Sequence, residues 1–520
     1  MTTSRLPGPP GIFTGLPNAI IDLNADAGVE LVKGQWRYHG AEVVTVEFRS
    51  PGEDQNPTGP LNQTYDIVPH AQGLDFDDSG WETVTPTDLD ARRGTGKVCF
   101  NWYRINVTIP EKIGNFDPTG STAVYEVVVD DYAEVWVNGE MQRTVGQAGG
   151  NVVGGFNSPN RIILARNVRL GQQFLIAVFG INGPISASPE NYIFIRTATL
   201  EFYAGDRERA AWEVPFEISW SDPALEDIVR VDTKLEKVAG DFVFTEGPVW
   251  APAGYLFFSS PDTNTIYRWA PDGTVNVFPA KSAYRGFDIG EYTKPGSCGL
   301  TLDPEGRLTV CEQGNRRIIR TSTRGEVVVM ADQYQDKRLN SPHDLVYKSD
   351  GSLYFTDPPF GLPQTFTDPR RELPFSGVFR VHEDQVVLLT DELTGPTGLA
   401  FSPDEKYLYV GNRDWQKKVL MRYPMNADGT LSPGEVFYDM TDVPGEDGIN
   451  GIKIDQEGNL YVCGPGGVWI LSPQGRALGV IKGPEQPHNL AWGDEDGRTL
   501  YMTAITGIYR IALNIPGIRP

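Results

Sequence analysis

Hydrophobic and polar positions alternate over short runs along nearly the whole chain, and helical periodicity is almost absent. The run AVYEVVVDDYAEVWVNG, at residues 123–139, alternates apolar and polar side chains and ends at Asn138-Gly139. Such alternation predicts strands with one buried face, and Asn-Gly is a strong hairpin signal. Clusters of Gly, Pro, Asn and Asp separate these runs and mark turns. The sequence therefore predicts an all-β protein.

A charged, weakly patterned segment at residues 205–235 separates two halves of different character. The 520 residues are too many for a single hydrophobic core, so several domains are expected. We predict an N-terminal extension over 1–29, a β-sandwich over 30–204, a linker over 205–235 and a second domain over 236–515.

The second half contains an internal repeat in which two short apolar strands are joined by a tight turn rich in Asp and Gly. Six copies are found, and they begin at Glu246, Cys298, His343, Thr397, Asn450 and His488. The residues between copies supply a further hairpin. Four strands per unit of roughly 40–50 residues is typical of a propeller blade. The repeat predicts a six-bladed β-propeller over 236–515.

The first residue of each copy is a candidate site residue. In a propeller the inner strand of each blade lines the central channel, so these six residues should point towards one axis. Core positions should be apolar, yet all six can hydrogen-bond, ligate or transfer protons, cysteine only weakly. Two of the five histidines of the chain are among them. Clustered titratable groups in a concavity are typical of an active site; the alternative is a polar ring satisfied by channel water.

Charge and composition exclude several classes of partner. The formal net charge of −23 disfavours nucleic acid and anionic membranes. No apolar run is long enough to span a bilayer, and the N-terminus does not have the pattern of a signal peptide. Four cysteines are too few for a disulfide framework. We expect a cytoplasmic protein that acts on a small molecule.

At these motifs the sequence resembles the gluconolactonase / senescence marker protein / luciferin-regenerating enzyme family. FTEGPVW, GNRRIIRT, GSLYFTDPPFGLP and GLAFSPDEKYLYV carry the resemblance, which covers about residues 224–513. It implies a six-bladed propeller with one divalent cation, commonly calcium or zinc. In that family the cation polarises a lactone carbonyl for attack by water.

The ligands implied by the resemblance are only partly retained. Glu246 matches the family's glutamate, but Thr397 replaces an asparagine and Asn450 replaces an aspartate. His343 stands where the family has a substrate-contacting asparagine. A metal on Glu246, Asn450 and Thr397 would have few carboxylates, which lowers calcium affinity. Two other ligand sets stay open: Glu446 or Asp447 could restore a carboxylate, or Glu246, His343 and His488 could hold zinc or iron.

A metal-free site is the main alternative. Glu246, His343 and His488 would suffice for general acid–base chemistry, as in a lyase, cyclase or isomerase. Cys298 and His343 could also form a nucleophile pair, although a buried, inert cysteine is the simpler interpretation. For substrate binding we predict a set that combines ring positions with two further residues: Cys298, Asn340, Thr397, Asn450 and Arg413.

The N-terminal half has a resemblance of its own. FDDSGWETVTPTD, NWYRINVTIP and the alternating run quoted above resemble galactose-binding-like jelly-roll domains. Such a domain could bind sugar or serve as a packing module, and it could mediate a homo-oligomer. The loops at 146–160 and 181–192 are long enough to reach the mouth of the propeller or a neighbouring subunit.

Three functions follow in order of preference. The first is hydrolysis of a lactone or related cyclic ester with a divalent metal. The second is a metal-independent acid–base enzyme on the same scaffold. The third is a non-catalytic, carbohydrate-type binding protein; two histidines at equivalent ring positions argue against it, because simple decay would not place them there.

Overall fold

The structure is a computed structural model. It describes residues 17–50, 59–93, 98–142, 159–182, 192–204, 213–230, 232–240, 242–271, 275–278, 284, 286, 288–321, 327–383, 385–445 and 448–520. The chain divides near residue 210 into two compact units. Among the described residues, no helix is both long and apolar enough to cross a membrane.

The described residues of the first unit form two antiparallel sheets and one short helix, α1 (Asp26–Leu31). One sheet has the order β1 (Ala19–Asp22), β11 (Phe194–Tyr203), β6 (Thr122–Asp130), β9 (Asn160–Ala165). The other has the order β3 (Leu61–Val68), β2 (Trp36–Arg49), β5 (Cys99–Thr108), β10 (Gln173–Asn182), β7 (Tyr132–Val137), β8 (Glu140–Met141), with β4 (Glu82–Val84) paired to β2. The 3₁₀ turn η1 covers Pro86–Asp88.

Both sheets of the first unit contribute to one core. Tyr103 and Ile176 from one sheet pack in the same buried cluster as Tyr125 and Leu200 from the other. The alternating run of the sequence analysis forms β6 and β7, which belong to different sheets, and Asn138-Gly139 turns β7 into β8. β1 pairs with β11, inside the segment that the sequence analysis set aside as an extension. The jelly-roll assignment stays a prediction.

The second unit consists mainly of six antiparallel sheets among its described residues. In chain order they are β14 (Glu246–Ala251), β15 (Tyr255–Ser260), β16 (Thr265–Trp269), β17 (Val275–Phe278); β18 (Ser297–Leu302), β19 (Leu308–Glu312), β20 (Arg317–Thr321), β21 (Val327–Ala331); β24 (Leu345–Tyr347), β25 (Leu353–Asp357), β26 (Gly377–His382), β27 (Gln385–Thr390); β28 (Pro396–Phe401), β29 (Tyr407–Asn412), β30 (Val419–Pro424), β31 (Glu435–Asp439); β32 (Ile452–Ile454), β33 (Leu460–Gly464), β34 (Gly467–Leu471), β35 (Ala477–Lys482); and β36 (Pro487–Gly493), β37 (Thr499–Ala504), β38 (Ile508–Ala512).

Two strands from the start of the unit complete the last two sheets. β12 (Glu217–Trp220) pairs with β35, and β13 (Leu235–Ala239) pairs with β38. Both lie in or at the end of the segment that the sequence analysis treated as a linker. A small hairpin of β22 (Gln333–Tyr334) and β23 (Lys337–Arg338) and the 3₁₀ turns η3 (Pro223–Asp227), η4 (Ile289–Glu291), η5 (Pro359–Gly361) and η6 (Thr365–Thr367) lie in connections.

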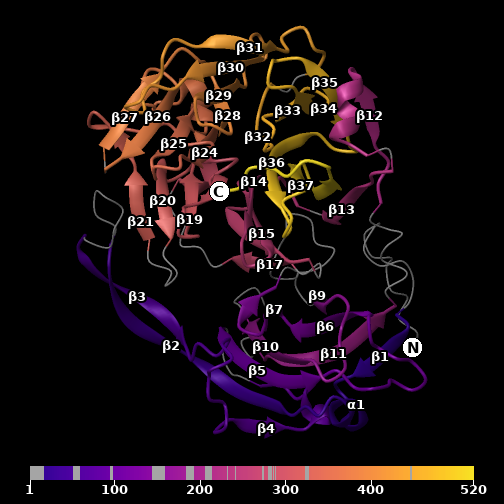
Figure 1. Cartoon of the computed structure of the whole chain (residues 1–520). Coiled ribbons are helices and arrows are strands. Elements are labelled where there is room, and N and C mark those ends of the chain that lie inside the picture. The colour runs from indigo at the N-terminus through magenta and orange to yellow at the C-terminus, as the bar shows by residue number, and fades with distance from the viewer. Residues whose placement is uncertain are drawn as a thin grey trace. The chain divides into compact units, whose positions relative to one another are not determined.

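The sheets are arranged around a centre (Figure 1). The first strand of each sheet contacts the first strand of the next, and β14 contacts both β18 and β36. Apolar side chains fill the space between successive sheets; Val249 and Phe257, for example, cluster with Leu300 and Val310. The expected all-β, propeller-like architecture is confirmed.

Candidate active site

The first residues of the six repeats form one buried ring. We call it the site ring: Glu246, Cys298, His343, Thr397, Asn450 and His488, each between 0% and 5% exposed. Each lies at or just before the start of the first strand of its sheet. The repeat therefore places six side chains that carry polar or ligating atoms in one interior location.

Close approach between neighbouring first strands holds the ring together. In four repeats the residue after the ring position is glycine, and a side chain there would strike the next strand. A Cβ on Gly247, which has φ +49°, would lie 2.0 Å from the carbonyl oxygen of Cys298. The Gly299 N–H donates to the His343 carbonyl, and the Gly451 N–H donates to the His488 carbonyl, both at 2.8 Å. The glycines thus fix the spacing of the ring through the backbone.

The other two repeats carry polar residues at this second position. Asp344 follows His343 and Asn489 follows His488, and the Asn489 Nδ2 donates to the Asp344 Oδ2 at 3.3 Å. Both side chains are buried. This hydrogen bond joins two sheets that are not neighbours in the ring, so the pair forms a floor directly beneath the site ring.

Glu246 is the only carboxylate of the ring. Its Oε1 accepts a hydrogen bond from the Asn450 Nδ2 at 2.9 Å, and its Oε2 accepts one from the Gly247 N–H at 3.0 Å. Burial raises the pKa of Glu246, and the nearby Asp344 raises it further, while the Gly247 N–H and Arg413 oppose the shift. A carboxyl group with a raised pKa is suited to proton transfer near neutral pH.

Both histidines of the ring are neutral. Burial, together with the positive charges of Arg413 and Lys294, lowers the pKa of His343 and of His488 to about 3. The Nδ1 of His343 has no hydrogen-bond partner among the described residues. The Nδ1 of His488 lies 3.4 Å from the Asn450 Nδ2. The His343 Nδ1 is therefore unpartnered within the described part of the chain, whereas the His488 Nδ1 accepts a long hydrogen bond from Asn450.

Each histidine packs against an aromatic ring, and each of these two rings also contacts the cationic group of a lysine or an arginine. The Lys294 ammonium lies 3.6 Å from the ring centroid of Phe244, which packs 4.5 Å from the ring of His488. The Arg413 guanidinium lies 5.8 Å from the centroid of Phe360, which meets His343 edge-on at 6.1 Å. Although the chain has a strongly negative net charge, Lys294 and Arg413 place two half-buried cations at the site. These cations favour the binding of a negatively charged group.

Cys298 lies beside Glu246 and His343. One ligand atom from each of these three side chains lies within 4.8 Å of the other two. Burial raises the pKa of the Cys298 thiol well above its usual value, and the carboxylate of Glu246 adds to the shift. A cysteine with this pKa is a thiol and a poor nucleophile unless a cation stabilises its thiolate. Cys311 and Cys463 are also buried and free.

The side chains of Thr397 and Asn340 donate hydrogen bonds to backbone carbonyls. The Thr397 hydroxyl donates to the Ile449 carbonyl at 2.7 Å. The Asn340 Nδ2 donates to the carbonyls of Asp357 and Phe375 at 3.0 and 2.9 Å. Neither contact involves another residue of the site ring. Of the predicted substrate-binding set, the structure thus brings Cys298, Asn450 and Arg413 close to Glu246 or the histidines, and gives Thr397 and Asn340 backbone partners.

The donor set around Glu246 fits a zinc-type cation better than calcium. Calcium prefers six to eight oxygen ligands, and the site ring offers a single carboxylate. Glu246, Cys298 and His343 supply a carboxylate, a thiol and an imidazole. This set matches the three protein ligands of a catalytic zinc. The Asn450 Oδ1 is buried without a partner among the described residues and adds one oxygen donor. The third member of this group is Cys298, whereas the sequence analysis considered His488; Glu446 and Asp447 lie outside the described residues.

Sequence reasoning missed the residues that surround the ring. Lys294, Phe244 and Phe360 lie in connections, where spacing gives no indication of position. Asp344 and Asn489 did leave a signal, since both stand where four of the six repeats have glycine. A polar residue at a position reserved for close backbone approach indicates a side chain with a role of its own.

Comparison with known proteins identifies the family. The family model described as "SMP-30/Gluconolactonase/LRE-like region" matches residues 244–506. A gluconolactonase of Zymomonas mobilis is 36% identical over 299 residues, which are 56% of this chain and 84% of that protein. A solved gluconolactonase structure from Xanthomonas campestris is 28% identical with a TM-score of 0.50, and the match covers 58% of this chain and 96% of that one.

A second solved structure is of a protein assigned as a gluconolactonase, and it is 30% identical with a TM-score of 0.51. The match covers 58% of this chain and 100% of that one. These matches concern the second unit, which holds the site ring. The chain belongs to the SMP-30/gluconolactonase/LRE-like family and is a gluconolactonase-like enzyme.

Proposed function

We propose that the site ring hydrolyses a lactone or related cyclic ester with the help of one divalent cation. The observation that carries the proposal is the buried group of Glu246, Cys298 and His343, whose ligand atoms lie within 4.8 Å of one another. Family membership supports the reaction class, and this donor set supports a zinc-type cation. When bound, such a cation would act as a Lewis acid towards the lactone carbonyl.

The residues around the cation have separate tasks in this proposal. The His488 Nδ1, which makes only the long 3.4 Å contact with Asn450 among the described residues, orients the attacking water and accepts its proton as the bond from the water oxygen to the lactone carbonyl carbon forms. The same proton passes to the ring oxygen when the ring C–O bond breaks, which gives the hydroxy acid. Lys294 and Arg413 stabilise that charge on the tetrahedral intermediate and on the carboxylate product. Asn450 holds the Glu246 carboxylate through the 2.9 Å hydrogen bond to Oε1. Phe244 and Phe360 limit the access of water to the two histidines.

The experiment is a metal analysis by mass spectrometry of protein purified without added metal, with kcat measured on a panel of aldonolactones. Wild type should carry about one equivalent of zinc or a similar ion. Glu246→Gln, Cys298→Ser and His343→Ala should each lose most of it, and kcat should fall on the order of 100-fold. Asp455→Asn is the matched control, because Asp455 is a buried carboxyl group in the turn between β32 and β33, hydrogen-bonded to Asn459 and Tyr461.

A metal-free acid–base enzyme is the second candidate, and the raised pKa of Glu246 favours it. In that case Glu246 itself takes the proton, and Asn450 orients its carboxylate. The two candidates separate on exhaustive chelation. Full activity of the chelated wild type, with loss of activity in Glu246→Gln, would exclude the metal-dependent reaction and support the second candidate. Wild-type kcat in Glu246→Gln would exclude both.

We further propose that the six sheets of the second unit are the blades of a six-bladed propeller. The first unit would be a galactose-binding-like jelly roll that serves for packing or for a homo-oligomer. An unchanged KM after removal of residues 1–205 would place the first unit outside the site. Light scattering of the full chain and of the truncated chain would show whether an oligomer depends on it.

A further inference from the structure

A second cavity lies at the opposite ends of the strands that carry the site ring. We call it the far pocket; its volume is about 150 Å³, and β14, β18, β24, β28, β32 and β36 all contribute to its walls. Glu246 begins β14, whereas Trp250 of the far pocket lies near the end of that strand. At about 3.3 Å per strand residue, Glu246 and Trp250 are roughly 13 Å apart along the strand.

A polar layer separates the two sites. The buried hydrogen bond between Asn489 and Asp344 forms the floor of the site ring, and the far pocket begins with the residues that follow on the same strands, such as Leu345 and Ala491. Burial raises the pKa of Asp344, and the positive charge of Lys453, which lines the far pocket, opposes this shift. The far pocket is therefore a distinct cavity on the far side of this layer.

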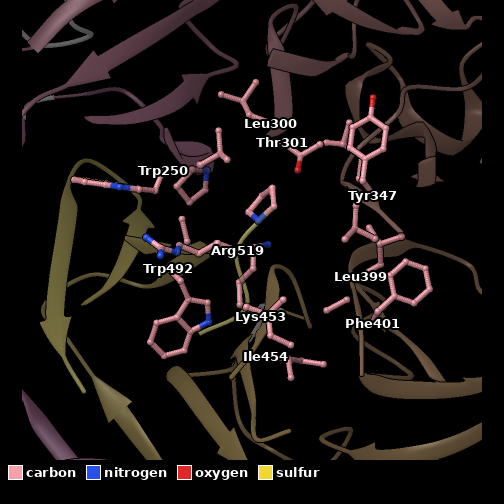
Figure 2. A pocket seen from close by; sticks show the side chains of 18 of the residues that line it. Trp250, Leu300, Thr301, Tyr347, Leu399, Phe401, Lys453, Ile454, Trp492 and Arg519 are labelled. Atoms are coloured by element: carbon pink, nitrogen blue, oxygen red, sulfur yellow. The ribbon is translucent and has the colours of Figure 1, made fainter. Parts of the chain in front are cut away.

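The walls of the far pocket are mainly apolar, with several polar side chains among them. The Arg519 guanidinium already donates to the carbonyls of Asp494 and Glu495, whereas the donors of Trp492 and Lys453 face the pocket with few acceptors. Leu300, Leu399 and Ile454 supply hydrocarbon surface (Figure 2). Trp492 is 2% exposed, and its indole N–H has no hydrogen-bond partner among the described residues. Figure 2 shows the indole nitrogen of Trp492 on the side that faces Lys453 and Ile454. A buried N–H without an acceptor costs free energy, so an acceptor is expected here.

The second donor is the ammonium group of Lys453. It is half-buried, donates to the Ile452 carbonyl at 3.1 Å, and forms no ion pair within the described part of the chain. The one carboxylate side chain of the lining, Glu405, is already compensated, because it lies 3.1 Å from the Lys348 ammonium and accepts hydrogen bonds from Ser349. The far pocket thus presents positive charge and an unpartnered N–H on an apolar wall.

We propose that the far pocket binds a small monocarboxylate with an apolar body, about the size of benzoate. The carboxylate accepts from the Lys453 ammonium and from the Trp492 indole N–H, and both are donors that lack a strong acceptor in the structure. The apolar body fills a cavity of about 150 Å³, a volume that accommodates a single benzene ring. A neutral ligand would leave the ammonium with the Ile452 carbonyl as its one hydrogen-bond acceptor among the described residues, which is less favourable than a bound carboxylate.

The test is isothermal titration of the full chain with sodium benzoate, with benzyl alcohol as the neutral probe of matched shape. We expect a single site of roughly millimolar affinity or tighter for benzoate, and weaker binding of benzyl alcohol. Lys453→Met should weaken benzoate binding by about tenfold or more. Trp492→Phe keeps an aromatic ring but removes the N–H, and should weaken it by about threefold to tenfold. Lys337→Met removes an exposed lysine elsewhere in the unit and should have no effect.

Three outcomes would overturn the proposal. If benzoate shows no binding at concentrations up to about 10 mM, the far pocket does not bind this class of ligand. Equal affinities in wild type, Lys453→Met and Trp492→Phe would place the bound benzoate elsewhere. Loss of binding in Arg413→Met but not in Lys453→Met would assign it to the site ring. Each outcome is read from benzoate binding and not from lactone turnover or metal content, so the failure of this proposal can be told from the failure of the proposed function.

Discussion

Replacement of Gly398 by alanine should displace one side of the site ring without removing any of its side chains. A Cβ on Gly398 would lie 2.2 Å from the carbonyl oxygen of Asn450 and 2.8 Å from the Cα of Gly451 and the N of Ile452. All three are backbone atoms of the neighbouring first strand, so no side chain can rotate away to make room. Because Cβ contacts under 3.0 Å are essentially never found, the strand must move by at least 3.0 − 2.2 = 0.8 Å at the Asn450 carbonyl.

This displacement has two measurable effects. Overpacking of this kind costs about 1–3 kcal/mol of stability, which corresponds to a fall in Tm of a few degrees for a unit of this size. The hydrogen bond from Asn450 to Glu246, now 2.9 Å long, would be stretched or broken. A misplacement near 1 Å at a catalytic group costs on the order of 100-fold in rate. We therefore expect a larger loss in kcat than the small loss in stability would suggest.

The assay is kcat and KM on the preferred lactone together with Tm by calorimetry. Gly290→Ala is the matched control, since a Cβ there would meet nothing within 4 Å and the residue has no positive φ. The control should keep wild-type Tm and kcat. Wild-type kcat in Gly398→Ala would refute the reasoning, because it would mean that the spacing between these two strands does not position the reacting groups.

Two further predictions concern charges near the ring. Burial raises the pKa of Asp357 to about 7, against backbone N–H donors from Asn340 and Ser341. The folded chain thus keeps a proton that the unfolded chain releases near pH 4, so the stability contributed by Asp357 should fall as pH rises from about 4 to 7. The Tm difference between wild type and Asp357→Asn should shrink over that range. A constant Tm difference would contradict the raised pKa. Asn450→Asp would place a second carboxylate beside Glu246, so calcium affinity measured by titration should rise by about tenfold or more. No gain in calcium affinity would show that these two positions do not face a common cation site.

The repeat, and through it the position of the ring, could be recognised in the amino-acid sequence. Each repeat begins with a polar residue and continues with apolar strands and a tight turn, which is a local pattern with a fixed period. Local patterns of this kind specify which backbone position faces the centre, because strand alternation and turn chemistry act over a few residues. Glu246, Cys298, His343 and Asn450 could therefore be selected before any coordinates were known, and the family resemblance rests on the same motifs.

The tertiary structure decided which of these residues work together. Periodicity gives equivalent positions but no distances across the ring, so the sequence analysis grouped His488 with Glu246 and His343 and did not consider Cys298 as a ligand; folding places Cys298 beside Glu246 and His343. The cations at Lys294 and Arg413 come from connections whose paths depend on the packing of whole sheets. The far pocket is also a tertiary feature, since six strands and the segment Ile518–Pro520 enclose it. Charge compensation and enclosure depend on neighbours distant in the chain, and only the folded structure brings those neighbours together.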